Sequence, residues 1–169
     1  MLFSLISLFS NAFALDLNVE KYKNPYTWVY TPDIIVCNDS PVTVEQVEKA
    51  VNEWRKKGIA IDKVKKQESR EQCNESYNSS EYGSIIITKR KRFLNVSQYN
   101  GYTTKYHPIY DDSNTKVISA IVEINTNTIK RKPWYAHKLI IHEVGHAIGF
   151  SHSSFSRNDV MKSSLTHVH

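Results

Sequence analysis

Cysteine and long apolar runs are scarce in this chain, and each scarcity excludes a class of protein. The 169 residues include two cysteines, Cys37 and Cys73, which lie too far apart for the CxxC pairs of cysteine metal sites. Beyond the N-terminus no run is apolar enough to cross a bilayer, so we expect no stable membrane insertion. Low-complexity tracts, internal repeats and obvious linkers are also absent, and the length suits one domain with a sizeable core.

Acidic residues are outnumbered by basic ones, which gives a formal net charge of +5. The basic residues form short clusters at 56–57, 63–66, 89–92 and 130–132. Such clusters can attract an anionic surface or polymer, but more often they form a solvated face. No nucleic-acid motif accompanies them, so we expect no nucleic-acid partner.

Charged side chains are missing from the first 14 residues, which are apolar and end in Ala12-Phe13-Ala14. This small-x-small ending predicts a signal peptide at 1–14, cleavage before Leu15 and a secreted protein. The basic segment that usually opens a signal peptide is absent, and the alternative is a core strand or a membrane tether. In an exported protein we expect Cys37 and Cys73 to form one disulfide, with a free, inert pair as the alternative.

Apolar periodicity along residues 15–169 predicts mixed α and β structure. One helix should begin at Thr43, where Gln46 completes a capping box, and end at Gly58. A second amphipathic helix is predicted over 134–150, just after Pro133. Strands are predicted at 27–37 (continuous or interrupted at Pro32), 59–64, 84–88, 102–110 and 117–125, with connections at 38–41, 66–82 and 111–114.

The second of these helices carries three histidines, one glutamate and one glycine at the spacing HExxHxxGxxH. His142 and His146 lie one helical turn apart on the same face, so their imidazoles can converge on one ion. Glu143 can lie beside that ion without binding it. Gly149 permits a left-handed turn, which would bring His152 back as a third ligand.

Three nitrogen ligands leave one position of a tetrahedral zinc ion open for water, as in a catalytic site. The alternative is a buried helix with incidental histidines. Such a helix would not need polar histidine and glutamate side chains within its apolar stretch, where burying them without a partner is costly.

The motif resembles that of the metzincin metallopeptidases, in which HExxHxxGxxH is followed by a methionine-containing turn. Met161 follows nine residues after His152 and resembles this Met-turn, although methionine also fills ordinary core gaps. The compact build and the Ser-His-Ser segment at 151–153 are most similar to the matrixins.

The resemblance implies an α+β, metzincin-like fold: a twisted mixed β-sheet with a backing helix and a zinc-binding active-site helix. Residues 102–107 would form the edge strand that lines the cleft and pairs with a polypeptide substrate, although they suit an interior hairpin equally. It also implies a secreted, monomeric zinc endopeptidase with one catalytic Zn2+. In this family zinc activates a water molecule, for which Glu143 would be the general base.

Several features depart from the family. No cysteine-containing inhibitory segment is visible, and the chain ends eight residues after Met161, so we expect the C-terminal part of the catalytic domain to be short. Asp111 and Asp112 suit a structural calcium ion, but a turn uses the same residues and is favoured. We expect the remaining histidines not to be ligands; they are His107, His137, His167 and His169.

Two alternative functions remain open at this stage. One is a domain that retains zinc but serves as a binding module without proteolysis, because its C-terminal part is short. The other is a zinc amidohydrolase that acts on a non-protein amide, such as a cell-wall cross-link, which the basic surface would favour slightly.

Overall fold

The computed structural model describes residues 17–73, 83–89, 99–153 and 159–163, so the predicted signal peptide at 1–14 lies outside the described residues. The described helices are α1 (Val44–Lys56), α2 (Thr126–Arg131) and α3 (Ala136–Ala147), with 3-10 turns η1 (Val19–Lys21), η2 (Glu71–Cys73) and η3 (Pro133–Tyr135). The strands are β1 (Thr27–Trp28), β2 (Asp33–Val36), β3 (Val64–Lys66), β4 (Ser84–Lys89), β5 (Gly101–Tyr106), β6 (Lys116–Val117) and β7 (Ser119–Ile124). No helix in this part of the chain has the length and apolarity needed to span a membrane.

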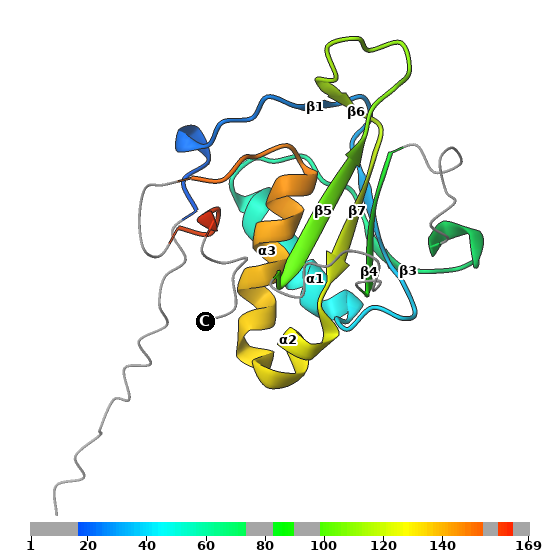
Figure 1. The fold of residues 1–169 in the computed structure, drawn as a ribbon, viewed down its shortest axis with the longest axis vertical. Coiled ribbons are helices and arrows are strands. Elements are labelled where there is room, and N and C mark those ends of the chain that lie inside the picture. Colours follow the sequence, from blue (N-terminus) through cyan, green and yellow to red (C-terminus); the bar gives the residue numbers. More distant parts are fainter. Residues whose placement is uncertain (1–16, 74–82, 90–98, 154–158, 164–169) are drawn as a thin grey trace, which may run out of the picture.

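The main sheet has five strands in the order β3-β2-β4-β7-β5 (Figure 1). Four strands are parallel, and β5 alone runs antiparallel to its neighbour β7. The predicted α+β class with a mixed sheet is therefore confirmed, and the strand expected at 102–107 lies at one edge of the described sheet as β5. A separate two-stranded parallel ladder joins β1 to β6.

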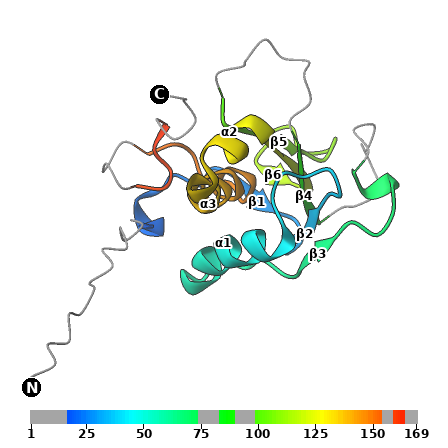
Figure 2. The ribbon, with the colours of Figure 1, turned by 90° about the horizontal axis from the view of Figure 1, so that it is seen from below.

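Helices α1 and α3 lie on the same side of the sheet, as the view from below shows (Figure 2). Alternate strand residues such as Ile34, Ile85 and Val122 point toward them and are fully buried. Trp54 of α1 packs in this layer, and its indole nitrogen donates to the carbonyl of Ile141 in α3 at 3.0 Å. The core therefore fixes α3 against both α1 and the sheet.

Helix α1 follows its predicted capping signals closely. Thr43 Oγ1 accepts from Gln46 N at 3.2 Å, and Gln46 Oε1 accepts from Thr43 N at 2.9 Å, which confirms the capping box. Its buried face consists of Val47, Ala50, Val51 and Trp54. The chain then leaves the helix through Gly58, whose φ of +82° favours glycine.

The strand predicted at 59–64 is wrong in position, because the ladder forms only at Val64–Lys66. Pairing is limited to the residues opposite Ile34, Ile35 and Val36 in the short strand β2. The carbonyl oxygens just before this strand accept hydrogen bonds from a side chain of α1. Arg55 Nε donates to Ile61 O at 3.0 Å, and Arg55 Nη2 donates to Asp62 O. The strand predicted at 27–37, either continuous or interrupted at Pro32, is interrupted: it consists of β1 and β2.

The predicted strands at 102–110 and 117–125 are also shorter in the structure. β5 ends at Tyr106, and a turn follows in which Asp111 N donates to Pro108 O at 3.0 Å. The second run is broken at Ile118, whose N–H pairs with Tyr106 O and whose carbonyl accepts from Gly83 N. β6 and β7 are separate strands because β6 pairs with β1 in the small ladder, whereas β7 pairs with β4 and β5 in the main sheet.

The predicted helix at 134–150 is correct in type but too long at both ends. A 3-10 turn precedes it, and regular helix extends only from Ala136 to Ala147. Helix α2 was not predicted, because its sequence has no apolar periodicity. It is capped by Asn125, whose Oδ1 accepts from Asn127 N at 2.9 Å, and it buries Thr128 against Asn100.

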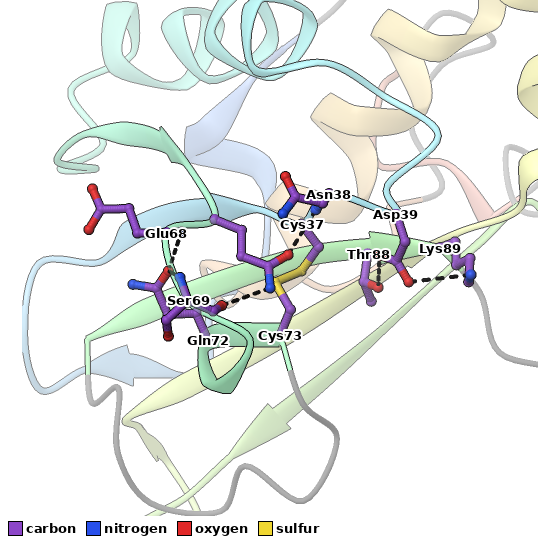
Figure 3. Close-up of a disulfide and its surroundings, with 10 residues drawn as sticks. Cys37, Asn38, Asp39, Glu68, Ser69, Gln72, Cys73, Thr88 and Lys89 are labelled. Atoms are coloured by element: carbon purple, nitrogen blue, oxygen red, sulfur yellow. Dashed lines mark hydrogen bonds and ion pairs between the residues drawn. A yellow bond between two sulfur atoms is a disulfide. The ribbon is translucent and has the colours of Figure 1, made fainter.

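A disulfide joins Cys37, after β2, to Cys73 in η2 across 36 residues (Figure 3). Polar contacts surround it: Thr88 Oγ1 donates to Asp39 Oδ1 at 3.0 Å, and Lys89 pairs with the other oxygen of Asp39 at 3.5 Å. The disulfide ties the end of β2 to η2, which contacts β4. Helix α3, by contrast, packs near β5 at one edge of the sheet.

Candidate metal centre

Helix α3 places one predicted ligand and the predicted general base in the core. His142 is fully buried and Glu143 is 1 % exposed, because the helix packs against α1, β5 and β7. Apolar neighbours fill the rest of its buried surface; they are Leu139, Ile140, Ile141, Val144 and Ala147. The polar residues therefore hold fixed positions on a well-packed helix.

The third predicted ligand is returned to the site by a Schellman turn. Phe150 N donates to Gly145 O at 2.9 Å and Gly149 N donates to His146 O at 3.1 Å, the two bonds that define this helix ending. Gly149 has φ +118°, in the region that favours glycine. A β-carbon there would also collide with Asn24 Oδ1 and lie 3.0 Å from Tyr26 O.

The imidazole nitrogens of the three histidines converge. His146 Nε2 lies 3.1 Å from His142 Nε2 and 3.0 Å from His152 Nε2. One ligand atom from each residue lies within 4.8 Å of the other two, so the group can hold a metal ion. The three residues differ in burial, since His142 is buried, His146 is half-buried and His152 is exposed.

Backbone carbonyls determine which nitrogen carries the proton in two of these rings. His142 Nδ1 lies 2.6 Å from Val160 O, and His146 Nδ1 lies 2.8 Å from Phe150 O. A carbonyl can only accept, so each Nδ1 must be the donor. In the neutral rings Nε2 then carries a lone pair, and two lone pairs face each other at 3.1 Å. A cation between them removes this repulsion.

Both helical histidines are held in the neutral form that metal binding requires. Burial, followed by the charge of His146, lowers the pKa of His142 from 6.5 to about 3. Burial likewise lowers the pKa of His146 to about 4, with a further contribution from the charge of His152. At neutral pH the two Nε2 atoms are therefore available to a metal without loss of a proton.

Glu143 is held by the edge strand. Thr103 Oγ1 donates to Glu143 Oε2 at 2.7 Å and also lies 3.1 Å from the Glu143 carbonyl oxygen. Gly101 leaves room for the carboxylate, because a β-carbon there would lie 2.5 Å from Glu143 Oε1. Gly101 and Thr103 of β5 thus form the wall against which the carboxylate lies.

Tyr135 is a further polar neighbour of Glu143. Burial, and then the negative charge of Glu143, raise the pKa of Tyr135 to about 12. Its hydroxyl is therefore protonated at neutral pH, and it forms a hydrogen bond with the Asn100 side chain. The buried Glu143 carboxylate is therefore near two polar side chains, Thr103 of β5 and Tyr135 of η3.

Met161 packs directly beneath the ligand helix. It is fully buried, and a β-carbon on Gly145 would lie 2.5 Å from Met161 Sδ and 2.7 Å from Trp54. The turn is closed by Asp159, whose Oδ1 accepts from Met161 N at 2.8 Å. The same turn supplies Val160 O, so it fixes the orientation of the His142 ring.

The other candidates lie apart from this group. His107 Nδ1 contacts Lys116 O at 2.6 Å, and His137 lies beside a separate cavity between α1 and α3. His167 and His169 lie outside the described residues. Asp111 is used in the turn, where its oxygens accept from Ser113 Oγ and Lys116 N at 2.6 Å each.

Sequence reasoning missed two residues that support the site. Thr103 lies 40 residues before Glu143, and nothing in a β-branched strand residue indicates a carboxylate partner. Asp159 has no assigned role in the HExxHxxGxxH motif or in the Met-turn resemblance. Its position two residues before Met161 is a usable signal, because aspartate side chains commonly accept from the backbone N–H two residues on.

Neither the known protein families nor the curated proteins contain a match to this chain.

Proposed function

We propose that this chain is a zinc-dependent endopeptidase of the metzincin kind, most similar to the matrixins, with His142, His146 and His152 as zinc ligands. The observation that supports this most strongly is the orientation of the two helical imidazoles. Their Nδ1 atoms are occupied by Val160 O and Phe150 O, so their Nε2 lone pairs face one another at 3.1 Å.

Zinc fits this donor set. Nitrogens bound to one zinc ion at about 2.05 Å and tetrahedral angles would lie about 3.3 Å apart. The measured separations of 3.0 and 3.1 Å around His146 are close to this value. Neutral imidazole is also a preferred zinc ligand, and three such ligands leave a coordination position for chemistry. Bound zinc would supply Lewis acidity to a substrate carbonyl and a more acidic water.

The proton transfers of peptide hydrolysis are assigned to Glu143. Glu143 follows the first ligand, His142, on helix α3, and Thr103 Oγ1 donates to Glu143 Oε2 at 2.7 Å. In the proposed reaction Glu143 accepts the proton of the attacking water and passes it to the departing amine. Its fixed position limits the motion needed for both transfers.

The edge strand β5 offers a way to hold the substrate. An extended peptide can pair with the main chain of an edge strand, and β5 is an edge of the described sheet. Thr103, Gly101 and Lys105 of β5 all lie against α3, and Lys105 Nζ lies 3.4 Å from His146 O. A peptide paired along β5 would therefore run beside the three histidines.

Export of the protein is part of the same proposal. The apolar segment at 1–14 supports it, and the Cys37–Cys73 disulfide is compatible with an oxidising compartment. A protein acting outside the cell would act on extracellular polypeptides.

The proposal is tested by zinc content together with hydrolysis of a quenched peptide library by the chain from Leu15. Glu143→Ala should retain one zinc per chain and lose cleavage, whereas His137→Ala, on the same helix but away from the cluster, should retain both. A chain that binds zinc but cleaves no peptide would refute the peptidase. Parallel assays on cell-wall polymer would then separate an amidohydrolase from a binding module.

A further inference from the structure

Residues 17–28, termed here the N-terminal strap, run alongside the turn that carries the third histidine (Figure 1). The strap contacts both ends of this turn. Trp28 Nε1 donates to Ala147 O at 3.0 Å where the turn begins, and Lys23 O accepts from Ser151 N at 3.0 Å just before His152. Between these two points Asn24 packs against Gly149.

Tyr22 connects the strap to a buried carboxylate. Its hydroxyl donates to Asp159 Oδ1 at 2.8 Å, and Asp159 is 2 % exposed. The same Asp159 oxygen accepts from Met161 N at 2.8 Å, and the other oxygen accepts from Ser153 Oγ. One carboxylate thus joins the strap, the Met161 turn and the residue that follows His152.

These contacts matter most for His152. The other two histidines are held by helix α3 and by carbonyl groups, whereas His152 is exposed and follows the helix. Both of its chain neighbours are fixed: Ser151 by Lys23 O at 3.0 Å, and Ser153 by Met161 O at 2.8 Å and by Asp159. The flanking backbone therefore places His152 beside the other two histidines.

We infer that the N-terminal strap is a functional part of the metal site, and that the Tyr22–Asp159 hydrogen bond sets metal affinity by positioning His152. This inference rests on the proposed zinc site. Tyr22 and Asp159 are positioning residues, since they act through the segment on either side of the ligand. Removal of such outer contacts typically weakens metal binding by about 10- to 100-fold.

Tyr22→Phe tests the inference with little disturbance to packing. The ring packs at 6.4 Å from Trp54 and 5.5 Å from Phe150, and phenylalanine retains both contacts. Thr88→Val is a matched control, because it removes a hydrogen bond of similar length, 3.0 Å to Asp39, near the disulfide (Figure 3). Zinc affinity is measured by competition with a chelator, and the melting temperature is measured on the metal-free proteins.

Tyr22→Phe should weaken zinc binding by about tenfold, whereas Thr88→Val should leave it unchanged even if both variants lower the melting temperature equally. Asp159→Ala removes the acceptor and should weaken binding at least as much, and the Tyr22→Phe/Asp159→Ala double variant should lose no more than Asp159→Ala alone. Unchanged zinc affinity in Tyr22→Phe, or additive losses in the double variant, would overturn the inference.

The affinity measurement also separates this inference from the peptidase proposal. A wild-type chain that binds zinc but cleaves no peptide refutes the peptidase, while weaker zinc binding by Tyr22→Phe still supports the role of the strap. A wild-type chain that binds no zinc overturns both.

Discussion

Thr103 and Glu143 are joined by a hydrogen bond of 2.7 Å between the edge strand and the ligand helix. The same hydroxyl also contacts the Glu143 carbonyl oxygen at 3.1 Å, so one threonine holds both the side chain and the backbone of this glutamate. The strand proposed to bind substrate therefore also positions the group proposed to move the proton.

Thr103→Val should lower kcat by about tenfold, because loss of a donor to a buried carboxylate costs about 1–3 kcal/mol. Zinc content should not change, since Thr103 contacts no histidine of the cluster in the described contacts. Thr103→Ser restores the hydroxyl and should recover most of the rate. Equal kcat values for the valine and serine variants would show that the hydroxyl does not position Glu143.

Gly101→Ala should abolish cleavage while zinc remains bound. The added β-carbon would lie 2.5 Å from Glu143 Oε1 and 2.7 Å from its Cδ, so the carboxylate must move. Gly58→Ala is the control, because its β-carbon meets nothing within 4 Å and only its φ of +82° is strained. Kinetics and bound zinc are measured on both variants; full activity in Gly101→Ala would show that Glu143 need not occupy its present position.

The metal-free protein should lose stability as the pH falls from about 6.5 toward 4. The pKa values of His142 and His146 in the folded chain are about 3 and about 4, whereas the ordinary value is 6.5. Over this range the unfolded chain binds protons that the folded chain does not, so acid favours unfolding; above pH 6.5 the contribution is fully present.

Chemical denaturation of the chelated protein across this pH range measures the effect. His142→Gln should reduce the slope of stability against pH. A slope that is the same in wild type and His142→Gln would contradict the assignment.

Replacement of both cysteines by serine should lower stability without altering the metal site. Closing a loop across 36 residues stabilises the fold by about 4 kcal/mol in the chain-entropy description. The disulfide lies by β2 and β4, whereas α3 packs near β5. Urea unfolding should shift to lower concentration, and zinc affinity at low denaturant should stay within about twofold, the difference that about 0.4 kcal/mol makes. A larger loss of affinity would show that the two regions are coupled.

Local signals in the sequence predicted the elements that depend on local chemistry. The capping box at Thr43 and Gln46 and the histidine spacing on α3 need only a few neighbouring residues to be recognised. The end of α3 was predicted too late, although Gly149 had been singled out as a turn, because the apolar pattern continues to Phe150.

Contacts between distant parts of the chain could not be predicted in the same way. Tyr22 and Asp159 are separated by 137 residues, and Thr103 and Glu143 by 40. Tyrosine, threonine and aspartate are common in turns and strands, so their residue types do not reveal such partners. The position of β3 likewise depends on which residues of β2 can pair with it, and the pairing is decided by the arrangement of the whole sheet.

The carbonyl contacts of His142 and His146 have a consequence for the life cycle of the protein. Both rings are oriented by Val160 O and Phe150 O, and a core shared with α1 and the sheet surrounds them. We expect folding not to depend on the proposed metal, because this core extends over two helices and a sheet, unlike the cores of small zinc-dependent domains that unfold without the ion. If the proposed site holds zinc, the folded chain could take up the ion after synthesis, and metal supply would then decide when the chain becomes active.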